Sequence, residues 1–202
     1  MSDMADGIPP LVDMARTPRG FGAELDRLTL ERARRGDVAA HASIYERYGV
    51  ACYNLALRIL GEPAAAEDVV QEVFLKMMST VHGFRGDAPF GAWLKRMTAN
   101  ATIDALRQHR RFGDEDPEAW FDMHARETHE AEGRVDAWAL LMALPPRARA
   151  IVVMHEVEGY THRELAELFG QSESYSKSIL SRALKRLNDA ALAARPEVSS
   201  DA

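Results

Sequence analysis

The chain has 202 residues, and a hydrophobic fraction of 47% is enough to build the cores of one or two domains. No run of about 18 apolar residues occurs, which excludes a helix that spans a membrane. The formal net charge is -6, and the single cysteine, Cys52, excludes an internal disulfide and fits a reducing cytoplasm. Because the neighbours of Cys52 are mostly apolar, we expect a buried core thiol.

Residues 1–22 are rich in proline and glycine and lack the apolar core and the small-residue cleavage site of a signal peptide. We therefore interpret them as a flexible extension. Beyond it, apolar residues recur at the helical spacing and no stretch of useful length alternates with period two, which predicts an all-α fold. The expected organisation is two small helical domains, residues 23–111 and 137–192, joined by an acidic linker over 112–136 and followed by a tail over 193–202.

Four helices are expected in the first domain. We predict them over 25–36, 38–60, 64–81 and 92–110, with Gly61 and Pro63 ending the second. The third helix has a broad apolar face, which consists of Ala66, Val69, Val70, Val73, Phe74, Met77, Met78 and Val81. Its opposite edge consists of Asp68, Gln71, Glu72, Leu75 and Ser79. The sequence FRGDAPFG, with two glycines and a proline, is predicted to form a loop before the fourth helix.

The end of the first domain is basic. Residues 85–111 carry six cations and two acids, a net charge of +4. A stripe on the fourth helix steps by three or four residues and so shares one face; it consists of Arg96, Asn100, Ile103, Arg107 and Arg110. Cations beside aromatic residues suit single-stranded nucleic acid, because cations follow phosphates and aromatic rings or pockets accept unstacked bases. The alternative is that Phe84, Phe90 and Trp93 plug the core at the helix ends, and for Trp93 alone we favour that alternative.

Residues 112–136 reverse the charge, with nine acids and two arginines for a net charge of -7. Helical periodicity is weak here and Pro117 interrupts it, so the segment is predicted to link the two domains. In the second domain, the pair Pro145 and Pro146 is typical of the entry to a helix, which we expect over 146–157.

The most informative stretch is GYTHRELAELFGQSESYSKSILSRALKRL, residues 159–187. Thr161 and Glu164 can form a capping box for a short helix that Gly170 ends. Ser172 can cap a longer helix that runs to about residue 188. A short helix, a tight turn and a longer helix form a helix-turn-helix, whose second helix enters the major groove of DNA.

The longer helix separates apolar from polar residues. Its apolar residues are Ile179, Leu180, Ala183, Leu184 and Leu187, at helical spacing. Its other side holds Ser174, Lys177, Ser178, Ser181, Arg182 and Lys185. Residues 174–187 contain four cations and no acid within an acidic chain, which favours DNA binding over a merely solvated basic face.

No catalytic motif is complete. His155 and Glu156 begin an HExxH zinc motif, but Gly159 stands where the second histidine is required. The other histidines show no ligand spacing, and we expect them to be solvated or to cap helices. The sequence also lacks a phosphate-binding loop, a nucleophile elbow and a cysteine pair. We therefore expect a protein that is not an enzyme and has no metal and no cofactor.

The segment EDVVQEVFLKMMSTVHGFRGDAPFGAWLKRMTANATIDALRQHRR closely resembles region 2 of bacterial RNA polymerase sigma factors, in the extracytoplasmic-function group of the sigma-70 family. The segment ALPPRARAIVVMHEVEGYTHRELAELFGQSESYSKSILSRALKRL resembles region 4 of the same proteins. The motifs occur in the family's order and spacing. The resemblance implies a sigma factor that binds core RNA polymerase, recognises the −10 and −35 promoter elements and promotes strand opening.

The resemblance also implies a role for each group of residues. The edge that docks on the β′ coiled coil of core polymerase is Asp68, Gln71, Glu72 and Leu75. The residues for the melted non-template strand of the −10 element are Phe84, Arg85, Phe90, Trp93, Arg96, Asn100, Arg107, Arg110 and Arg111. The loop 84–90 captures an extruded base of that strand. The residues for the −35 duplex are Ser174, Lys177, Ser178, Ser181, Arg182 and Lys185. The polymerase β subunit and an anti-sigma factor are further implied partners, and the linker is implied to follow the RNA exit path.

This chain departs from the family at the start of the recognition helix. Tyr175 and Ser176 stand where the family usually has Thr and Val, and Ile179 replaces an arginine. The apolar spacing survives, so the departures concern −35 preference and not the fold. A sigma factor is expected to be cytoplasmic and monomeric when free. The alternative function is a dimeric helix-turn-helix regulator that binds an operator.

Overall fold

The computed structural model describes residues 20–109, 117–123 and 137–193, and within these ranges every regular element is a helix. The all-α prediction is therefore confirmed. By their contacts the residues divide into two units, one of residues 1–57 and 62–105 and the other of residues 58–61 and 106–202. The predictions for Arg110 and Arg111, for the N-terminal extension and for most of the linker and the tail lie outside the described residues.

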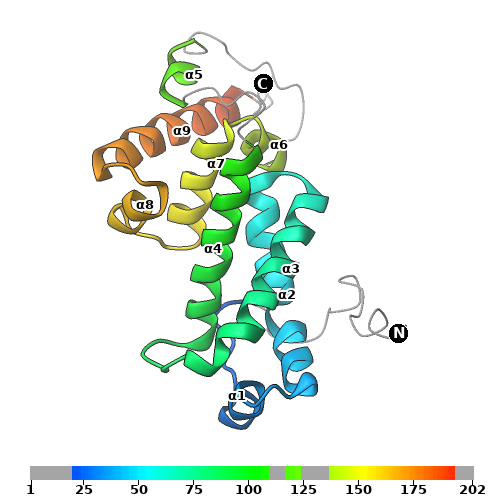
Figure 1. The fold of residues 1–202 in the computed structure, drawn as a ribbon. Coiled ribbons are helices and arrows are strands. Elements are labelled where there is room, and N and C mark those ends of the chain that lie inside the picture. Colours follow the sequence, from blue (N-terminus) through cyan, green and yellow to red (C-terminus); the bar gives the residue numbers. More distant parts are fainter. Residues whose placement is uncertain (1–19, 110–116, 124–136, 194–202) are drawn as a thin grey trace, which may run out of the picture. The chain divides into compact units, whose positions relative to one another are not determined.

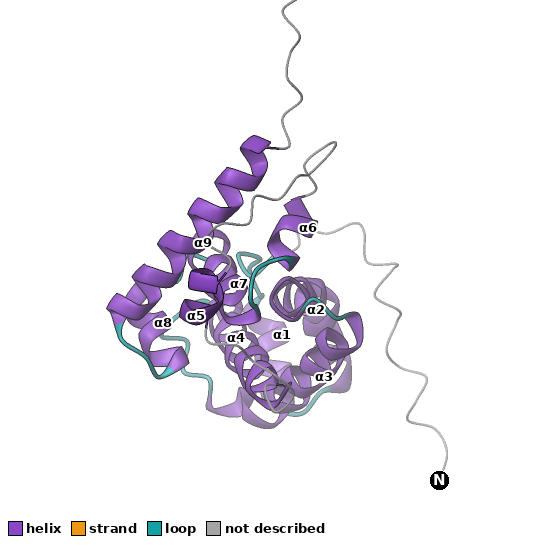
Figure 2. Ribbon diagram, turned by 90° about the horizontal axis from the view of Figure 1, so that it is seen from above, coloured by secondary structure: helices purple, strands orange, loops and turns teal. Residues whose placement is uncertain are grey.

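The N-terminal unit is built mainly from α1 (Arg27–Arg34), α2 (Val38–Leu60), α3 (Pro63–Thr80), the 3-10 turn η2 (Val81–Gly83) and α4 (Phe90–His109). The helices α2, α3 and α4 lie side by side in two perpendicular views (Figure 1, Figure 2). Asp26 caps α1, because its carboxylate accepts a hydrogen bond from the Thr29 backbone N–H at 2.8 Å. Pro63 occupies the start of α3, where a backbone N–H would have no partner within the helix.

The core of this unit contains the apolar faces that the sequence predicts. The predicted face of α3 is buried except for Met78, which is 42% exposed. Tyr48 from α2, Met77 from α3 and Leu94 from α4 are fully buried. Removal of apolar surface from water, worth about 25 cal/mol per Å², is the main term that holds such helices together.

Cys52 lies in this core with no exposed surface, as predicted. Its Sγ is 3.3 Å from Oγ1 of Thr98, which also donates a hydrogen bond to the carbonyl oxygen of Leu94 at 2.9 Å. The thiol therefore packs as a small apolar group with one polar neighbour.

Two details of α4 differ from the prediction. The helix begins at Phe90 rather than at residue 92, because the Pro89 carbonyl already accepts hydrogen bonds from the backbone N–H groups of Ala92 and Trp93. The predicted cationic stripe includes Ile103, but this side chain is only 1% exposed and belongs to the core. An apolar side chain on a half-buried helix gains more from the core than from the surface.

The C-terminal unit contains α5 (Pro117–Met123), α6 (Ala137–Met142), α7 (Pro146–Val152), the π-helical segment η4 (Val153–Val157), α8 (His162–Phe169) and α9 (Glu173–Ala193). The helices α7 and α8 both pack against α9. The helix expected over 146–157 therefore exists, but its second half is π-helical, since the Glu158 N–H bonds to the Val153 carbonyl.

A helix inside the predicted linker, α5, is the main difference from the sequence-based expectation. Its first residue is Pro117, and proline is tolerated in the first turn of a helix although it breaks a helix interior. Phe121 is 8% exposed, so the helix is anchored by burial. With 7 residues, α5 is too short to produce a periodic apolar pattern.

The predicted helix-turn-helix is present as α8 and α9. The Thr161 hydroxyl accepts from the Glu164 N–H at 3.2 Å, and the Glu164 carboxylate accepts from the Thr161 N–H at 2.8 Å, so the capping box is complete. Gly170 ends α8 at a φ of 63°, a left-handed conformation that glycine adopts without strain. Ser172 caps α9 by accepting from the Tyr175 N–H at 3.0 Å.

The helix α9 continues to Ala193, beyond the predicted end near residue 188. Of its predicted apolar residues, Ile179, Leu180 and Ala183 are buried, but Leu184 is 38% exposed. Successive residues of an α-helix are about 100° apart, so Leu184 turns away from the face on which Ala183 is buried.

Candidate nucleic-acid and polymerase interfaces

The predicted −35 residues lie on the side of α9 opposite to its buried face. The side chains of Ser174, Lys177, Ser181, Arg182 and Lys185 are exposed, and Ser178 is half-buried. Exposed hydroxyl groups and cations can form hydrogen bonds with the base edges and phosphates of duplex DNA. The structure thus places all six candidates where a duplex can reach them.

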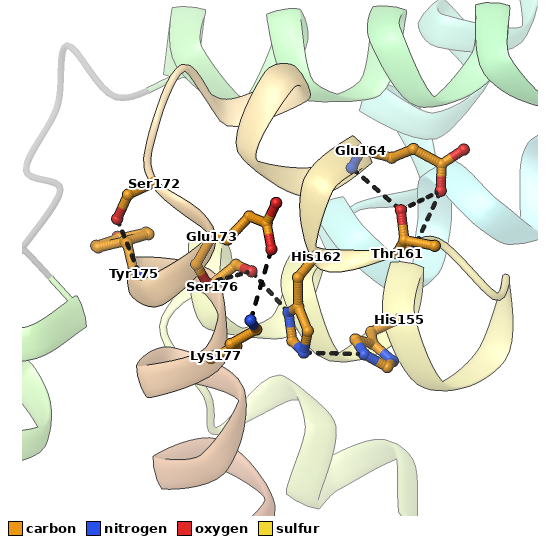
Figure 3. Close-up of polar contacts among 9 residues, drawn as sticks. All are labelled: His155, Thr161, His162, Glu164, Ser172, Glu173, Tyr175, Ser176 and Lys177. Carbon is orange, nitrogen blue, oxygen red and sulfur yellow. Dashed lines mark hydrogen bonds and ion pairs between the residues drawn. The ribbon is translucent and has the colours of Figure 1, made fainter.

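Polar contacts at the start of α9 join neighbouring turns of the helix and link Ser176 to His162 of α8 (Figure 3). Lys177 Nζ lies 3.5 Å from a carboxylate oxygen of Glu173, one helical turn earlier. The Tyr175 side chain is half-buried, and its hydroxyl lies 3.4 Å from Nη1 of Arg147 on α7. Tyr175 therefore lies against the body of the unit, whereas Ser174 and Lys177 on either side are exposed.

Helix α5 covers one edge of the basic face of α9. The Arg182 Nη1 atom lies 2.9 Å from Asp122 Oδ1, and the Arg186 guanidinium lies 4.7 Å from the centroid of the Trp120 ring. The side chains of Arg182 and Asp122 are 42% and 74% exposed, so their ion pair contributes at most about 1 kcal/mol. A DNA phosphate can compete for Arg182 at that cost.

Three side chains that the sequence analysis did not connect with one another form a polar cluster at the helix-turn-helix. Nε2 of His155 lies 3.2 Å from Nε2 of His162, and Nδ1 of His162 lies 2.7 Å from Oγ of Ser176 (Figure 3). Ser176 is only 2% exposed. Desolvation, together with the nearby His155 and Lys177, lowers the pKa of His162 below its usual value.

The cluster left no signal in the sequence, because its members come from η4, α8 and α9. Their spacing along the chain matches no ligand or catalytic motif. Only the packing of the three elements brings the rings and the hydroxyl together. The expectation of a merely solvated or helix-capping side chain is therefore wrong for His162, which contacts both His155 and Ser176.

The aromatic residues of the predicted −10 site pack against one another. Phe84 is 9% exposed, Phe90 is 6% exposed and Trp93 is half-buried. The ring centroids of Phe84 and Phe90 are 5.4 Å apart, and each lies 5.2 Å from that of Trp93. The two phenylalanines thus pack as core plugs. The surface beside them consists of the exposed loop residues 85–89, and capture of a base there stays a prediction.

The polar candidates of the −10 site are exposed. Arg85 Nε lies 3.1 Å from Asp87 Oδ2, and both side chains are largely in solvent. Arg96, Asn100 and Arg107 have exposed side chains along α4. The predicted cations Arg96 and Arg107 of α4 are therefore both exposed, whereas the predicted Ile103 is buried.

The predicted docking edge for polymerase also lies on the surface. Asp68, Gln71 and Glu72 are exposed, and Leu75 is 64% exposed. Exposed apolar side chains that lie together, rather than singly, can mark a surface that binds another protein. The neighbouring Met78, which the sequence placed in the core, extends this exposed apolar surface.

Among the side chains that the structure describes, no group of three His, Cys, Asp or Glu residues is arranged to hold a metal ion. None of the described helices combines the length and the apolar character needed to cross a bilayer.

Two models of protein families match the chain. The model for Sigma-70 region 2 matches residues 44–112, which include α3, the loop after it and α4. The model for Sigma-70, region 4 matches residues 134–187, which include the helix-turn-helix. The two regions follow each other in the order that the sequence predicts.

Among solved structures, the chain is similar to CnrH in complex with the cytosolic domain of CnrY. The identity is 25%, the TM-score is 0.49, and the match covers 81% of this chain and 94% of that one. It is also similar to the sigma factor RpoE in complex with the anti-sigma factor NepR from Bartonella quintana. Here the identity is 21%, the TM-score is 0.48, and the match covers 83% and 94% of the two chains.

Curated relatives are sigma factors. The chain is 30% identical to the ECF RNA polymerase sigma factor SigE of Mycolicibacterium smegmatis over 164 residues, which cover 76% of this chain and 63% of that protein. It is 29% identical to the ECF RNA polymerase sigma factor SigM of Mycobacterium tuberculosis over 171 residues, which cover 83% of this chain and 87% of that protein. The chain therefore belongs to the sigma-70 family of bacterial RNA polymerase sigma factors, in its extracytoplasmic-function group.

Proposed function

We propose that the protein is the promoter-recognition subunit of bacterial RNA polymerase, which binds the core enzyme, recognises −10 and −35 elements and promotes strand opening. The observation that carries this proposal is the pairing of a region 2 match over residues 44–112 and a region 4 match over residues 134–187 in one chain. Such a subunit contributes binding energy and no covalent chemistry, so it is not an enzyme.

The N-terminal unit is proposed to bind core polymerase and the melted −10 element. Its docking edge for the β′ coiled coil is Asp68, Gln71, Glu72 and Leu75, which are exposed together on α3. Its DNA surface consists of Arg85, Trp93, Arg96, Asn100, Arg107, Arg110 and Arg111, with Phe84 and Phe90 supporting the loop from the core. Extrusion of a base costs about a few kcal/mol, which contacts of the captured base and the phosphates can offset without ATP.

The C-terminal unit is proposed to read the −35 element as duplex DNA. Helix α9 would lie in the major groove, with Ser174, Lys177, Ser178, Ser181, Arg182 and Lys185 as its contacts. The hydroxyls suit base edges and the cations suit phosphates. Arg182 would exchange its ion pair with Asp122 for a phosphate.

Membership of the family supports further partners as proposals. The free subunit is proposed to be a cytoplasmic monomer that also contacts the polymerase β subunit, with the acidic linker along the RNA exit path. An anti-sigma factor is a proposed inhibitor. The proposed domain limits are those of the sequence, residues 23–111 and 137–192 with the linker over 112–136.

Reconstitution with core polymerase tests the function directly. The purified chain, core enzyme and genomic DNA are incubated with nucleotides, and the 5′ ends of the transcripts are sequenced. We expect discrete start sites that are absent with core alone and that share two upstream sequence elements. Transcripts with the same scattered ends as those of core alone would refute the proposal.

A further inference from the structure

The hydroxyl group of Ser176, on the recognition helix α9, is buried. Ser176 is 2% exposed, and its Oγ donates a hydrogen bond to the carbonyl oxygen of Glu173 at 3.2 Å. The same Oγ lies 2.7 Å from Nδ1 of His162. A hydroxyl has one proton to donate, so with that proton on the bond to the Glu173 carbonyl we assign Nδ1–H of His162 as the donor to Oγ.

The protonation of His162 then determines that of His155. A neutral imidazole with a proton on Nδ1 has a lone pair on Nε2. Because Nε2 of His155 lies 3.2 Å from Nε2 of His162, His155 must donate from its own Nε2–H. On this assignment the donors run in one direction, from His155 to His162, from His162 to Ser176, and from Ser176 to the Glu173 carbonyl.

The relay joins three elements at the point where DNA would be read. His155 lies on η4, His162 begins α8, and Ser176 lies in the first turns of α9. Ser174, Lys177 and Ser178, three of the proposed −35 contacts, are within two residues of Ser176 on the same helix. Any rotation of Ser176 about the helix axis would carry these three side chains with it.

We propose that His155, His162 and Ser176 act as positioning residues for −35 recognition, through a one-directional hydrogen-bond relay that holds the start of α9 in a single orientation against α8 and η4. The inference rests on the proposed function, because it assigns a role within DNA reading. None of the three residues is proposed to touch DNA.

Desolvation, together with His155 and Lys177, lowers the pKa of His162 and favours its neutral form, whereas the carboxylates of Glu173 and Glu156 act in the opposite direction. Glu156 lies beside His155, with Oε1 3.6 Å from Nδ1, and Glu173 and Lys177 of α9 face His162 together with His155. One additional proton can be shared between the two facing Nε2 atoms if His155 moves its own proton to Nδ1, toward Glu156. If both rings were protonated, both Nε2 atoms would carry a proton and neither could accept. The Nε2–Nε2 contact would then be lost.

The first test reads the tautomers in the full-length protein. Long-range ¹H–¹⁵N correlation spectra near pH 7.5 report which ring nitrogen of each histidine carries the proton. We expect Nδ1–H for His162 and Nε2–H for His155. Since a free neutral imidazole prefers Nε2–H, Ser176→Ala should return His162 to that form. An Nε2–H tautomer of His162 in the wild-type protein, or an unchanged spectrum in Ser176→Ala, would overturn the relay.

The second test separates positioning from packing. Ser176→Thr keeps the hydroxyl and Ser176→Val replaces it by a methyl group, while both add the same volume. The probe is a duplex that the wild-type protein selects from a random-sequence pool, and the reference is a scrambled duplex of equal length. We expect the ratio of the two affinities to fall by about threefold to tenfold in Ser176→Val and to recover in Ser176→Thr. If circular dichroism shows that both variants are folded and their affinity ratios are equal, Ser176 has no positioning role.

A matching pair at His162 extends the test if a branched side chain does not fit at position 176. His162→Asn retains a donor near the Nδ1 position and His162→Phe does not, and we expect only the latter to lose discrimination. The outcomes are distinguishable from failure of the proposed function. A wild-type protein that selects no duplex would refute −35 reading and the role of the relay in it, whereas normal selection with no loss in Ser176→Val and His162→Phe would refute the relay alone.

Discussion

Cys52 and Ser176 are small polar side chains inside apolar surroundings, and each is held by a specific neighbour. Cys52 has Thr98 beside its sulfur, and Ser176 has His162 and the Glu173 carbonyl. A buried polar atom is costly unless it is hydrogen-bonded, so such residues restrict the packing around them.

The Cys52 thiol is expected to be inert in the folded protein. Burial raises the pKa of Cys52 to about 12, and only the thiolate reacts with disulfide reagents. With an aromatic disulfide reagent near pH 8, the native protein should release almost no chromophore, and the denatured protein should release one equivalent per chain. Rapid stoichiometric reaction of the native protein would show that the thiol is not in the core.

Stability should fall as the solution becomes acidic through the range where histidines titrate. Folding lowers the pKa of His162 from the ordinary histidine value of about 6.5, so near and below that pH the unfolded chain binds more protons than the folded one. The contribution of His162 is therefore fully present above about pH 6.5 and is lost as the pH falls.

Urea denaturation at about pH 7.5 and about pH 5.5 measures this effect as a difference in the free energy of unfolding. The difference should be smaller in His162→Gln than in the wild-type protein. His82→Gln is the matched control, because His82 is an exposed histidine outside the cluster. An equal effect of both substitutions would contradict the assignment to His162.

At the scale of helices, α5 contacts cations of α9 that include Arg182, a proposed −35 contact. Helix α5 brings Asp122 and Trp120 onto Arg182 and Arg186 of the recognition helix. Asp122 and Trp120 of α5 thus contact two arginines to which DNA phosphates could also bind. Because the ion pair is exposed, the competition is weak and adjustable rather than absolute.

Asp122→Ala is expected to increase affinity for the selected duplex by about twofold to fivefold at low salt, since Arg182 becomes free to contact a phosphate. Asp189→Ala removes an equal charge from an exposed position of α9 and serves as control. Fluorescence anisotropy over a salt series measures both. If both variants gain equally in affinity, the gain comes from the change in net charge and not from the release of Arg182.

The exposed edge of α3 is expected to bind core polymerase. Replacing Asp68 and Gln71 together by Ala should reduce recovery of core enzyme in a pull-down by at least about tenfold while helicity stays unchanged, because two central polar contacts are lost. The control is Arg27→Ala with Glu31→Ala, which removes an exposed ion pair of 2.9 Å on α1. Wild-type recovery by the α3 variant would refute the docking assignment.

At the scale of the whole molecule, the oligomeric state separates the proposed function from its alternative. A sigma subunit is expected to be a monomer of 22.5 kDa when free, whereas an operator-binding regulator pairs two recognition helices on two half-sites. Light scattering after gel filtration at micromolar concentration measures the mass. A stable species of twice the monomer mass that binds duplex DNA without polymerase would favour the regulator.

The sequence by itself determined the all-α class, the N-terminal helices to within a few residues, the capping box at Thr161 and the turn at Gly170. These features depend on interactions between residues close in sequence, so local patterns encode them. The sequence also identified the family, because the motifs of region 2 and region 4 occur in the family's order along the chain. The exposed positions of Asp68, Gln71 and the α9 cations followed from helical periodicity.

Only the tertiary structure decided which side chains of these elements are buried and which are engaged. Ile103 is in the core, Leu184 is exposed, and Phe84 and Phe90 pack on Trp93 instead of facing solvent. The His155–His162–Ser176 cluster and the Arg182–Asp122 pair join residues from different elements. Contacts of this kind depend on how helices pack, and since several packings can satisfy one amphipathic pattern, no local spacing in the chain specifies them.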